Sequence, residues 1–262
     1  MLEAEHELFE RDGVVVIRGL FKDWIPLLES GVNANEKEPG QWFKDYTPGQ
    51  SEGRFWADYC NWQRIEAFEK FVKESPAAEV VKAIMGSQSV RMFHEHVLVK
   101  GTGSNKITPW HHDAPYYPVD AKQTLSLWIP LDPVARSSAV EFIGGSHKWG
   151  KHYKPLSFNG EYYEHQTEEE ILPDIDAHRD DYNILGWDLE PGDAIAFNYL
   201  TIHGAPGNNS ATHSRRAVSF RWLGDEAVYV SRGGKTSPQY PHLINVLSTG
   251  DPLPEDEFPF VA

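Results

Sequence analysis

The first third of the chain combines a short hydrophobic run with segments whose hydrophobic residues recur at helical spacing. Residues 14–17 form a β-branched run bounded by glycines, which predicts a buried strand. Between residues 63 and 74 the hydrophobic residues recur every three or four positions, and Ser75-Pro76 has the form of an N-cap followed by proline. We therefore expect three helices that pack against a sheet, over residues 24–32, 63–74 and 76–85, and mostly loop over residues 33–61.

After Gly86 the pattern changes to short hydrophobic or alternating runs, separated by Gly, Pro, Asn and Ser. Such runs predict an antiparallel sandwich or jelly roll. The predicted strands are residues 90–100, 108–113, 124–131, 139–143, 184–189, 194–197, 201–203 and 215–223. The expected fold class is mainly β (α+β), with residues 1–88 as N-terminal support, 89–232 as a barrel core and 233–262 as an irregular C-terminal tail.

Composition narrows the class of protein. The 262 residues are 40% hydrophobic and 13% aromatic, which favours one large domain over residues 1–262, since β-barrel domains commonly reach about 200 to 250 residues. The net charge of −15 argues against nucleic acid or an anionic membrane as partner and leaves a small molecule, with the oligomeric state open. Cys60 is the single cysteine, and the acidic start lacks the hydrophobic core of a signal peptide, so we expect a cytoplasmic protein.

The segment Trp110-His111-His112-Asp113 carries the clearest candidate chemistry. In an extended strand His111 and Asp113 would lie on one face, because side chains alternate, and His203 is the candidate for a third metal ligand. His178 and Asp180 have the same His-x-Asp spacing, but they lie in the acidic polar segment 161–181, which we expect to be a solvated excursion. The same pattern therefore occurs twice, and only the His111 pair lies in a predicted strand.

Two histidines and one carboxylate suit non-haem Fe(II), because they leave coordination positions open for a bidentate oxoacid and dioxygen. The far carboxylate of the oxoacid then needs a fixed cation, a role that suits arginine. In the predicted strand 215–223, Arg215 shares a face with small residues that leave room for a ligand. We therefore favour Arg215 as the clamp and keep Arg216 as the alternative.

Several other residues deserve the same examination. His94 and His96 alternate like a metal pair, yet no glutamate follows them, so we expect histidines of the core or the barrel lining. His147 lies in a glycine-rich loop that we expect to be solvated. The aromatic residues around the metal motif are candidates for a substrate wall, namely Trp110, Tyr116 and Tyr117.

Six segments, in order and at compatible spacing, resemble the phytanoyl-CoA dioxygenase family of Fe(II)- and 2-oxoglutarate-dependent oxygenases. They lie between about residues 90 and 225, and the N-terminal phrase DGVVVIRGL is also similar to that family's opening. The segments are TPWHHDAPYYPVD, SLWIPLDPV, EFIGGSHKWG, LEPGDAIAFN, HGAPGN and SRRAVSFRWLGD.

The resemblance implies a double-stranded β-helix, a cupin-like jelly-roll barrel, with helices packed outside. It implies iron held by His111, Asp113 and His203, and 2-oxoglutarate held by Arg215 with Trp128 lining its pocket. The middle residue of the motif, often glutamine in relatives, is His112 here, and alternation points it away from the metal. The loop between His203 and Arg215 has one residue more than the commonest spacing, which keeps Arg216 as an alternative.

The implied reaction is hydroxylation of an unidentified small molecule by O2, with 2-oxoglutarate converted to succinate and CO2 and with ascorbate as the reductant in vitro. One alternative is a related halogenase, in which the carboxylate ligand is lost so that halide binds; the presence of Asp113 argues against it. The other is a catalytically silent jelly-roll binding protein, which the nine tryptophans would suit.

Overall fold

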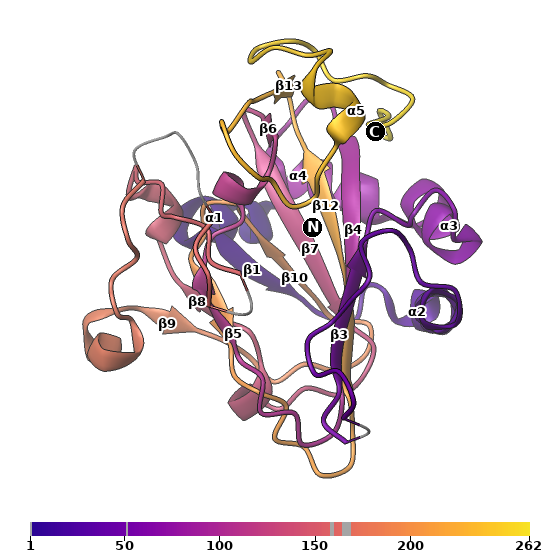
Figure 1. Cartoon of the computed structure of the whole chain (residues 1–262), viewed down its shortest axis with the longest axis vertical. Helices are drawn as coiled ribbons and strands as arrows, with labels where there is room; N and C mark the ends of the chain where they lie inside the picture. Colours follow the sequence, from indigo (N-terminus) through magenta and orange to yellow (C-terminus); the bar gives the residue numbers. More distant parts are fainter. Residues whose placement is uncertain (1, 51, 158–159, 164–168) are drawn as a thin grey trace.

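Two antiparallel sheets lie face to face, and helices cover the outer side of the larger one (Figure 1). The computed structural model describes residues 2–50, 52–157, 160–163 and 169–262. The helices are α1 (Glu3–Asp12), α2 (Ile25–Lys37), α3 (Glu66–Glu74), α4 (Ala77–Met85) and α5 (Pro241–Ile244). The strands are β1 (Val14–Ile17), β2 (Lys44–Asp45), β3 (Phe55–Tyr59), β4 (Arg91–Lys100), β5 (Thr108–His111), β6 (Val119–Asp120), β7 (Thr124–Pro130), β8 (Glu141–Ile143), β9 (Ile184–Leu185), β10 (Ala194–Phe197), β11 (His203–Ala205), β12 (Arg215–Leu223) and β13 (Val228–Tyr229).

Strands that are distant in the sequence are neighbours in both sheets. The larger sheet has the order β1-β10-β7-β12-β4-β3-β2, the smaller sheet has the order β5-β11-β8-β9, and β13 pairs with β6. β12 lies near the middle of the larger sheet, between β7 and β4. This order places one face of β4 and β12 opposite the smaller sheet, where a pocket forms.

The side chains of β12 alternate between the two faces of the larger sheet, as the sequence predicts. Val218, Phe220 and Trp222 are fully buried in the core beneath the helices. Ser219 and Arg221 point to the other face and line the pocket. A single strand therefore contributes both to the core and to the candidate site.

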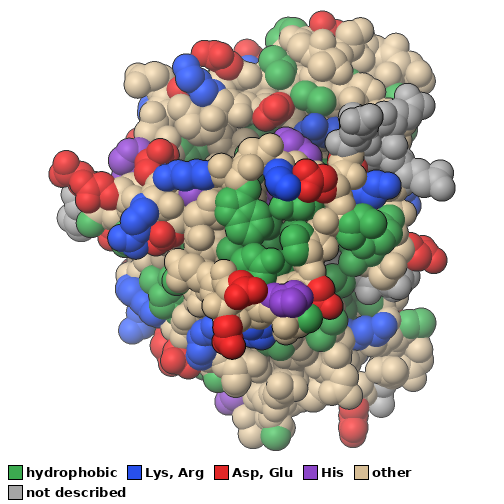
Figure 2. Space-filling view, turned by 90° about the vertical axis from the view of Figure 1, so that its left-hand side faces the viewer, with side chains coloured by type: hydrophobic (Ala, Val, Ile, Leu, Met, Phe, Trp, Pro, Cys, Tyr) green, Lys and Arg blue, Asp and Glu red, His purple; other side chains and the backbone are tan. Residues whose placement is uncertain are grey.

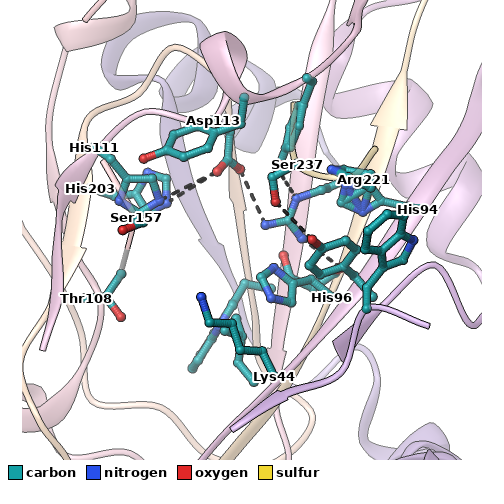
Figure 3. A pocket seen from close by; sticks show the side chains of 18 of the residues that line it. Lys44, His94, His96, Thr108, His111, Asp113, Ser157, His203, Arg221 and Ser237 are labelled. Carbon is teal, nitrogen blue, oxygen red and sulfur yellow. Dashed lines mark hydrogen bonds and ion pairs between the residues drawn. The ribbon is translucent and has the colours of Figure 1, made fainter. Parts of the chain in front are cut away.

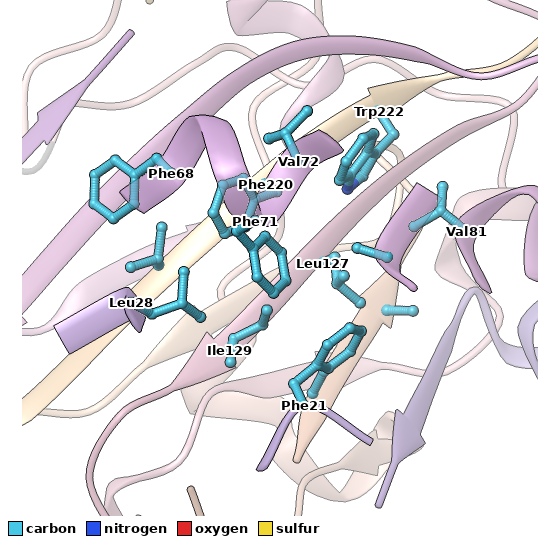
Figure 4. Packing of buried hydrophobic residues seen from close by; sticks show 14 of the residues in the cluster. Phe21, Leu28, Phe68, Phe71, Val72, Val81, Leu127, Ile129, Phe220 and Trp222 are labelled. Atoms are coloured by element: carbon cyan, nitrogen blue, oxygen red, sulfur yellow. The ribbon is translucent and has the colours of Figure 1, made fainter. Parts of the chain in front are cut away.

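Aromatic packing between α3 and β12 fixes the helices on the sheet. Phe71 stacks on Phe220 with ring centroids 4.6 Å apart, and Phe68 meets Phe220 edge-on at 6.2 Å. Leu28 of α2 and Val81 of α4 enter the same cluster (Figure 4). The hydrophobic spacing predicted from the sequence thus corresponds to real helices whose apolar faces lie against the larger sheet.

We expect Phe220→Ala to lower the free energy of unfolding by about 3 to 5 kcal/mol, because it leaves a cavity beneath α3. Urea denaturation followed by circular dichroism measures this difference. Val246→Ala is the matched control, since Val246 is 73% exposed, and it should change stability by less than about 0.5 kcal/mol. Equal effects of the two substitutions would contradict the core as described.

The structure corrects several predicted boundaries. The segment 33–61 is mostly loop, as predicted, but α2 continues to Lys37 and β2 and β3 lie within it. β3 owes its extended form to pairing with β4, a contact between residues distant in the sequence that local pattern does not reveal. α1 was not predicted, and Phe9 is its one buried residue, so its helical pattern is weak. The predicted strand 184–189 reduces to β9.

The C-terminal tail is largely irregular, as predicted, and returns to the larger sheet. It contains α5, and Val261 and Ala262 form backbone hydrogen bonds with Val90, the residue before β4. Figure 2 shows the side that carries the smaller sheet, where acidic and basic side chains surround a central hydrophobic area. No helix in the described part of the chain is long and apolar enough to cross a membrane.

Candidate metal centre

The pairing of β5 with β11 brings two histidines together that lie far apart in the sequence. His111 and His203 are directly opposite each other in the antiparallel register. Their ring centroids are 4.2 Å apart. Cross-strand neighbours on one face of a sheet approach at this scale, so the predicted pair is assembled by strand pairing.

Asp113 reaches the same place from outside the strand. β5 ends at His111, and Asp113 has helical backbone angles, φ −72° and ψ −35°, at the start of the short 3-10 helix Ala114–Tyr116. Its Oδ1 lies 3.7 Å from His111 Nε2 and 3.9 Å from His203 Nε2 (Figure 3). The predicted strand 108–113 is thus wrong at its end, and the turn after His111 supplies the placement that strand alternation was expected to give.

The backbone fixes the orientation of both imidazoles. His111 Nδ1 lies 2.8 Å from the Pro109 carbonyl oxygen, and His203 Nδ1 lies 2.9 Å from that of Thr201. Because a carbonyl oxygen only accepts, each Nδ1 carries the proton and donates it. Burial lowers the pKa of both side chains, for His203 to about 3, so both rings are neutral at neutral pH. Each Nε2 then presents a lone pair toward the Asp113 carboxylate, as metal ligands require.

The Asp113 carboxylate is held in its charged form. Burial by itself raises the pKa of Asp113, but the charge of Arg221 and the neighbouring histidines lower it to about 2. Arg221 Nη2 lies 3.6 Å from Oδ2, and Ser126 Oγ donates to Oδ2 at 3.1 Å. Oδ2 is thus held by Arg221 and Ser126, while Oδ1 faces the two imidazoles. The ligand atoms of the three residues all lie within 4.8 Å of one another, so the donor set fits one divalent cation.

A cavity of about 330 Å³ extends from these three residues between the sheets. Its floor consists of two rows of side chains from adjacent strands. The pairs across β4 and β12 are Lys100 with Arg215, Leu98 with Ala217, His96 with Ser219 and His94 with Arg221, and all eight residues line the cavity. The floor therefore carries an arginine at each end, with an apolar pair and a polar pair between them.

The two candidate clamp arginines have different surroundings. Arg216 forms ion pairs with Asp132 and with Glu29, both at 2.7 Å, on the other face of β12. Arg215 is 6% exposed, lines the cavity and donates to the Ser138 carbonyl oxygen. In the described ranges no carboxylate lies within ion-pair distance of Arg215. Burial lowers its pKa to about 10, so the guanidinium stays charged. The geometry favours Arg215 over Arg216 for binding a ligand carboxylate.

Lys100 is a buried amine that the sequence analysis missed. It is 3% exposed and lies opposite Arg215. Lys100 Nζ donates to Thr108 Oγ1 at 3.1 Å and to the Pro206 carbonyl oxygen at 3.2 Å. Burial, and then the charge of Arg215, lower its pKa to about 6. Alternation along β4 could have identified it, because Lys100 is on the same face as His94 and His96.

Trp128 and His112 lie on opposite sides of the site. Trp128 lines the cavity opposite Ser219 of β12, consistent with the predicted pocket role. His112 is 2% exposed and points away from the metal ligands, where its Nε2 accepts a hydrogen bond from the Tyr153 backbone N–H at 2.9 Å. Burial lowers the pKa of His112 to about 4. As expected, His112 supports the loop around Tyr153 rather than facing the metal.

The remaining candidates divide between the cavity and other places. Tyr116 and Tyr117 line the cavity, but Trp110 does not: its Nε1 donates to Asp176 at 3.0 Å on the outer side of the smaller sheet. The prediction of Trp110 as a substrate wall is therefore wrong. His147 contacts the Glu10 carbonyl oxygen at the end of α1. The side chain of His178 is 63% exposed, and His178 is not part of the cluster of metal-ligand atoms.

The chain resembles known proteins in sequence and in fold. The family model described as phytanoyl-CoA dioxygenase (PhyH) matches residues 9–217. A Caenorhabditis elegans protein described as "Probable phytanoyl-CoA dioxygenase" is 25% identical over 180 residues, which are 64% of this chain and 54% of that protein. The match thus spans about half the length of that relative.

Two solved structures have a similar fold over the whole chain. One is the epimerase SnoN in complex with Fe3+, alpha ketoglutarate and nogalamycin RO, with a TM-score of 0.77 and 19% identity over 100% of this chain and 98% of that one. The other is the non-heme alpha ketoglutarate dependent carbocyclase SnoK from nogalamycin biosynthesis, with a TM-score of 0.77 and 21% identity over 100% and 97%. At these identities the likeness shows the fold alone.

Proposed function

The chain belongs to the phytanoyl-CoA dioxygenase family, and we propose that it is an Fe(II)- and 2-oxoglutarate-dependent dioxygenase that hydroxylates a small molecule. The observation that carries the proposal is one cavity with two complementary ends. At one end His111, Asp113 and His203 present three metal-ligand atoms, and at the other the buried Arg215 faces the cavity without a carboxylate partner among the described residues. A dicarboxylate that chelates the metal and ends on Arg215 would satisfy both ends.

Each group of residues in the cavity would have a separate role. His111, Asp113 and His203 would hold iron on one side and leave its other positions to ligands. Arg221 and Ser126 keep Asp113 charged and oriented, while Arg215 would orient the far carboxylate of 2-oxoglutarate. When bound, iron and 2-oxoglutarate would couple reduction of O2 to formation of succinate and CO2 and to conversion of a substrate C–H bond to an alcohol. Buried aromatic walls would exclude water from this chemistry.

The proposal also covers the fold, the domain organisation, the partner and the cellular location. We propose that the two sheets are a double-stranded β-helix and that residues 1–262 act as one domain with Trp128 beside the cosubstrate. The net charge of −15 supports a small-molecule partner, rather than nucleic acid or membrane, for a cytoplasmic enzyme. Ascorbate would serve as reductant in the assay.

The halogenase alternative needs an open position where the carboxylate ligand would be. Asp113 Oδ1 faces both Nε2 atoms at under 4 Å and occupies that direction. The second alternative, a catalytically silent binding protein, does not explain why the imidazoles of His111 and His203 are oriented so that their Nε2 atoms converge. We therefore retain the hydroxylase.

The test is an assay of purified protein with Fe(II), ascorbate, O2 and 2-oxoglutarate. We expect slow release of succinate even without a prime substrate, and loss of that release when the iron is chelated. Absence of both 2-oxoglutarate binding and succinate would overturn the proposal. For a substrate that the enzyme converts, the mass of the product distinguishes hydroxylation, which adds one oxygen atom, from epimerisation or ring closure.

Lys100 makes the binding of 2-oxoglutarate depend on pH. Its pKa of about 6 in the free protein means that the amine is mostly neutral at pH 7, and a carboxylate bound beside Arg215 favours the charged form. Binding should therefore take up a proton, and affinity should fall by up to about tenfold per pH unit as pH rises above about 6. Calorimetric titrations in two buffers of different ionisation enthalpy measure the proton uptake, and Lys100→Met should abolish it. Equal proton uptake by both proteins would contradict the role of Lys100.

A further inference from the structure

Deep in the cavity, three polar side chains of the floor contain atoms without a partner. Ser219 Oγ, His96 Nε2 and both ring nitrogens of His94 are buried without a hydrogen-bond partner in the described part of the chain. Ser219 is 1% exposed and His94 is 2% exposed. Buried polar groups of native proteins are nearly always hydrogen-bonded. Three together on a cavity floor therefore indicate that a ligand supplies the missing partner.

These atoms lie between the metal ligands and the distal clamp Arg215, nearer to the metal end. Ser219 and His96 are cross-strand neighbours, one pair before the Arg221 and His94 pair along the floor. At about 3.3 Å per residue, Ser219 lies about 13 Å along β12 from Arg215 but only about 7 Å from Arg221, whose guanidinium is 3.6 Å from Asp113. The unpartnered atoms thus lie toward the metal end and away from the distal clamp. Figure 3 shows His96 on the same side of the cavity as Arg221.

Aromatic rings form the wall beside His96. Tyr59 meets His96 edge-on with ring centroids 5.2 Å apart, and Trp42 stacks on Tyr59 at 5.9 Å. Tyr116, from the other side of the cavity, meets Tyr163 at 5.5 Å. All of these residues line the cavity. Flat apolar walls of this kind fit a ring better than a flexible chain, because rings stack on rings with little loss of conformational freedom.

Charge and size restrict the ligand further. Burial lowers the pKa of His94 and of His96 well below the ordinary value, so both rings are neutral. A neutral imidazole and a hydroxyl can each donate and accept, which matches a hydroxyl or carbonyl oxygen. Asp113 is the one carboxylate of the described cavity lining and belongs to the metal site, so the lining offers a cationic ligand no further carboxylate. The volume of about 330 Å³ is near the lower limit of about 300 to 1,000 Å³ for ligand sites, and 2-oxoglutarate must fit in it too.

We propose that the prime substrate is a compact ring compound with a neutral hydroxyl or carbonyl oxygen, which binds to His96 and Ser219 while its ring lies against Trp42 and Tyr59. The inference rests on the proposed function and names its substrate class. His96 and Ser219 would fix the substrate beside the metal ligands. They would select against analogues that lack the hydroxyl or carbonyl oxygen, because such an analogue leaves both side chains buried without a hydrogen-bond partner.

The experiment compares two probes that differ by one hydroxyl group, 2-naphthol and naphthalene. Each is titrated calorimetrically into anaerobic protein that has been loaded with Fe(II) and 2-oxoglutarate. We expect 2-naphthol to bind about tenfold more tightly than naphthalene. Ser219→Ala and His96→Leu should each reduce this ratio severalfold, and His96→Gln, which keeps donor and acceptor groups, should restore most of it.

Ser87→Ala is the matched control. The Ser87 hydroxyl is also buried without a described partner, but Ser87 does not line the cavity, so its removal should leave the ratio unchanged. Ser219→Ala removes only one oxygen atom, so it tests the inference even where His96→Leu impairs folding.

Several outcomes would overturn the inference alone. These are equal binding of the two probes, a ratio unchanged by Ser219→Ala and His96→Leu, and tighter binding of octanoyl-CoA than of 2-naphthol, each in protein that binds iron and 2-oxoglutarate normally. A wild-type protein that binds neither iron nor 2-oxoglutarate would instead contradict the proposed function and remove the basis of the inference. The loading step of the same titration separates these cases.

Discussion

Replacing His203 with alanine is expected to lower succinate formation by about 1,000-fold or more, a loss of about 4 kcal/mol in metal and transition-state binding. The physical reason is that His203 supplies one of three converging ligand atoms, and its Nε2 is already turned toward Asp113 by the Thr201 carbonyl oxygen. Two ligands alone hold the ion weakly and in no fixed geometry. Succinate formation and metal affinity, measured on the same preparation, check this result.

The chain contains its own control for this substitution. His178 belongs to a second His-x-Asp pattern, but its side chain is 63% exposed and its nearest carboxylate contact is Asp181 at 3.9 Å. His178→Ala should leave metal affinity and succinate formation within about twofold of wild type. If His203→Ala formed succinate at the wild-type rate, or if His178→Ala lost succinate formation to the same extent as His203→Ala, the metal centre would be elsewhere.

Arg215→Met is expected to raise the KM for 2-oxoglutarate by about 100-fold while metal affinity stays unchanged. A hydrogen bond to a charged group contributes about 1.5 to 3 kcal/mol, and the buried guanidinium would form two with the distal carboxylate. The substitution should have little effect on 2-oxobutanoate, which lacks that carboxylate. Steady-state kinetics with the two oxoacids therefore isolates the interaction from general damage to the site.

Arg216→Met is the neighbouring control. Arg216 binds Asp132 and Glu29 on the other face of β12, so its loss should lower stability modestly and leave both KM values within about twofold. A larger effect of Arg216→Met than of Arg215→Met on the KM for 2-oxoglutarate would reverse the assignment of the clamp.

The sequence predicted the parts of the site that follow from local periodicity. Alternation along residues 215–223 placed Arg215 and Arg221 on one face and Phe220 on the other, and the structure confirms both. The same reasoning put His112 away from the metal; its contact with Tyr153 agrees, although β5 ends at His111 and His112 itself lies outside the strand. Alternation is reliable where a strand is long and central, because pairing on both sides keeps the backbone regular.

Other parts depend on pairing between distant segments, which one sequence does not display. β3 is held by β4, and the charge that adds to burial in lowering the pKa of Lys100 comes from Arg215, which β12 places opposite it. Asp113 reaches the site through a turn that begins right after His111, where alternation no longer applies. Trp110 precedes His111 in β5, so alternation itself places it on the outer face of the smaller sheet, where it meets Asp176, and the prediction for Trp110 did not apply this rule.

The central claim is that iron and 2-oxoglutarate bind together at His111, Asp113 and His203. Anaerobic titration of 2-oxoglutarate into the Fe(II)-loaded protein, followed by visible absorption, tests it most directly, because chelation of Fe(II) by a 2-oxoacid produces a charge-transfer band. We predict a band that saturates at one 2-oxoglutarate per chain, is absent without iron and is lost in His203→Ala. No band in the wild type, or an equal band in His203→Ala, would contradict the account.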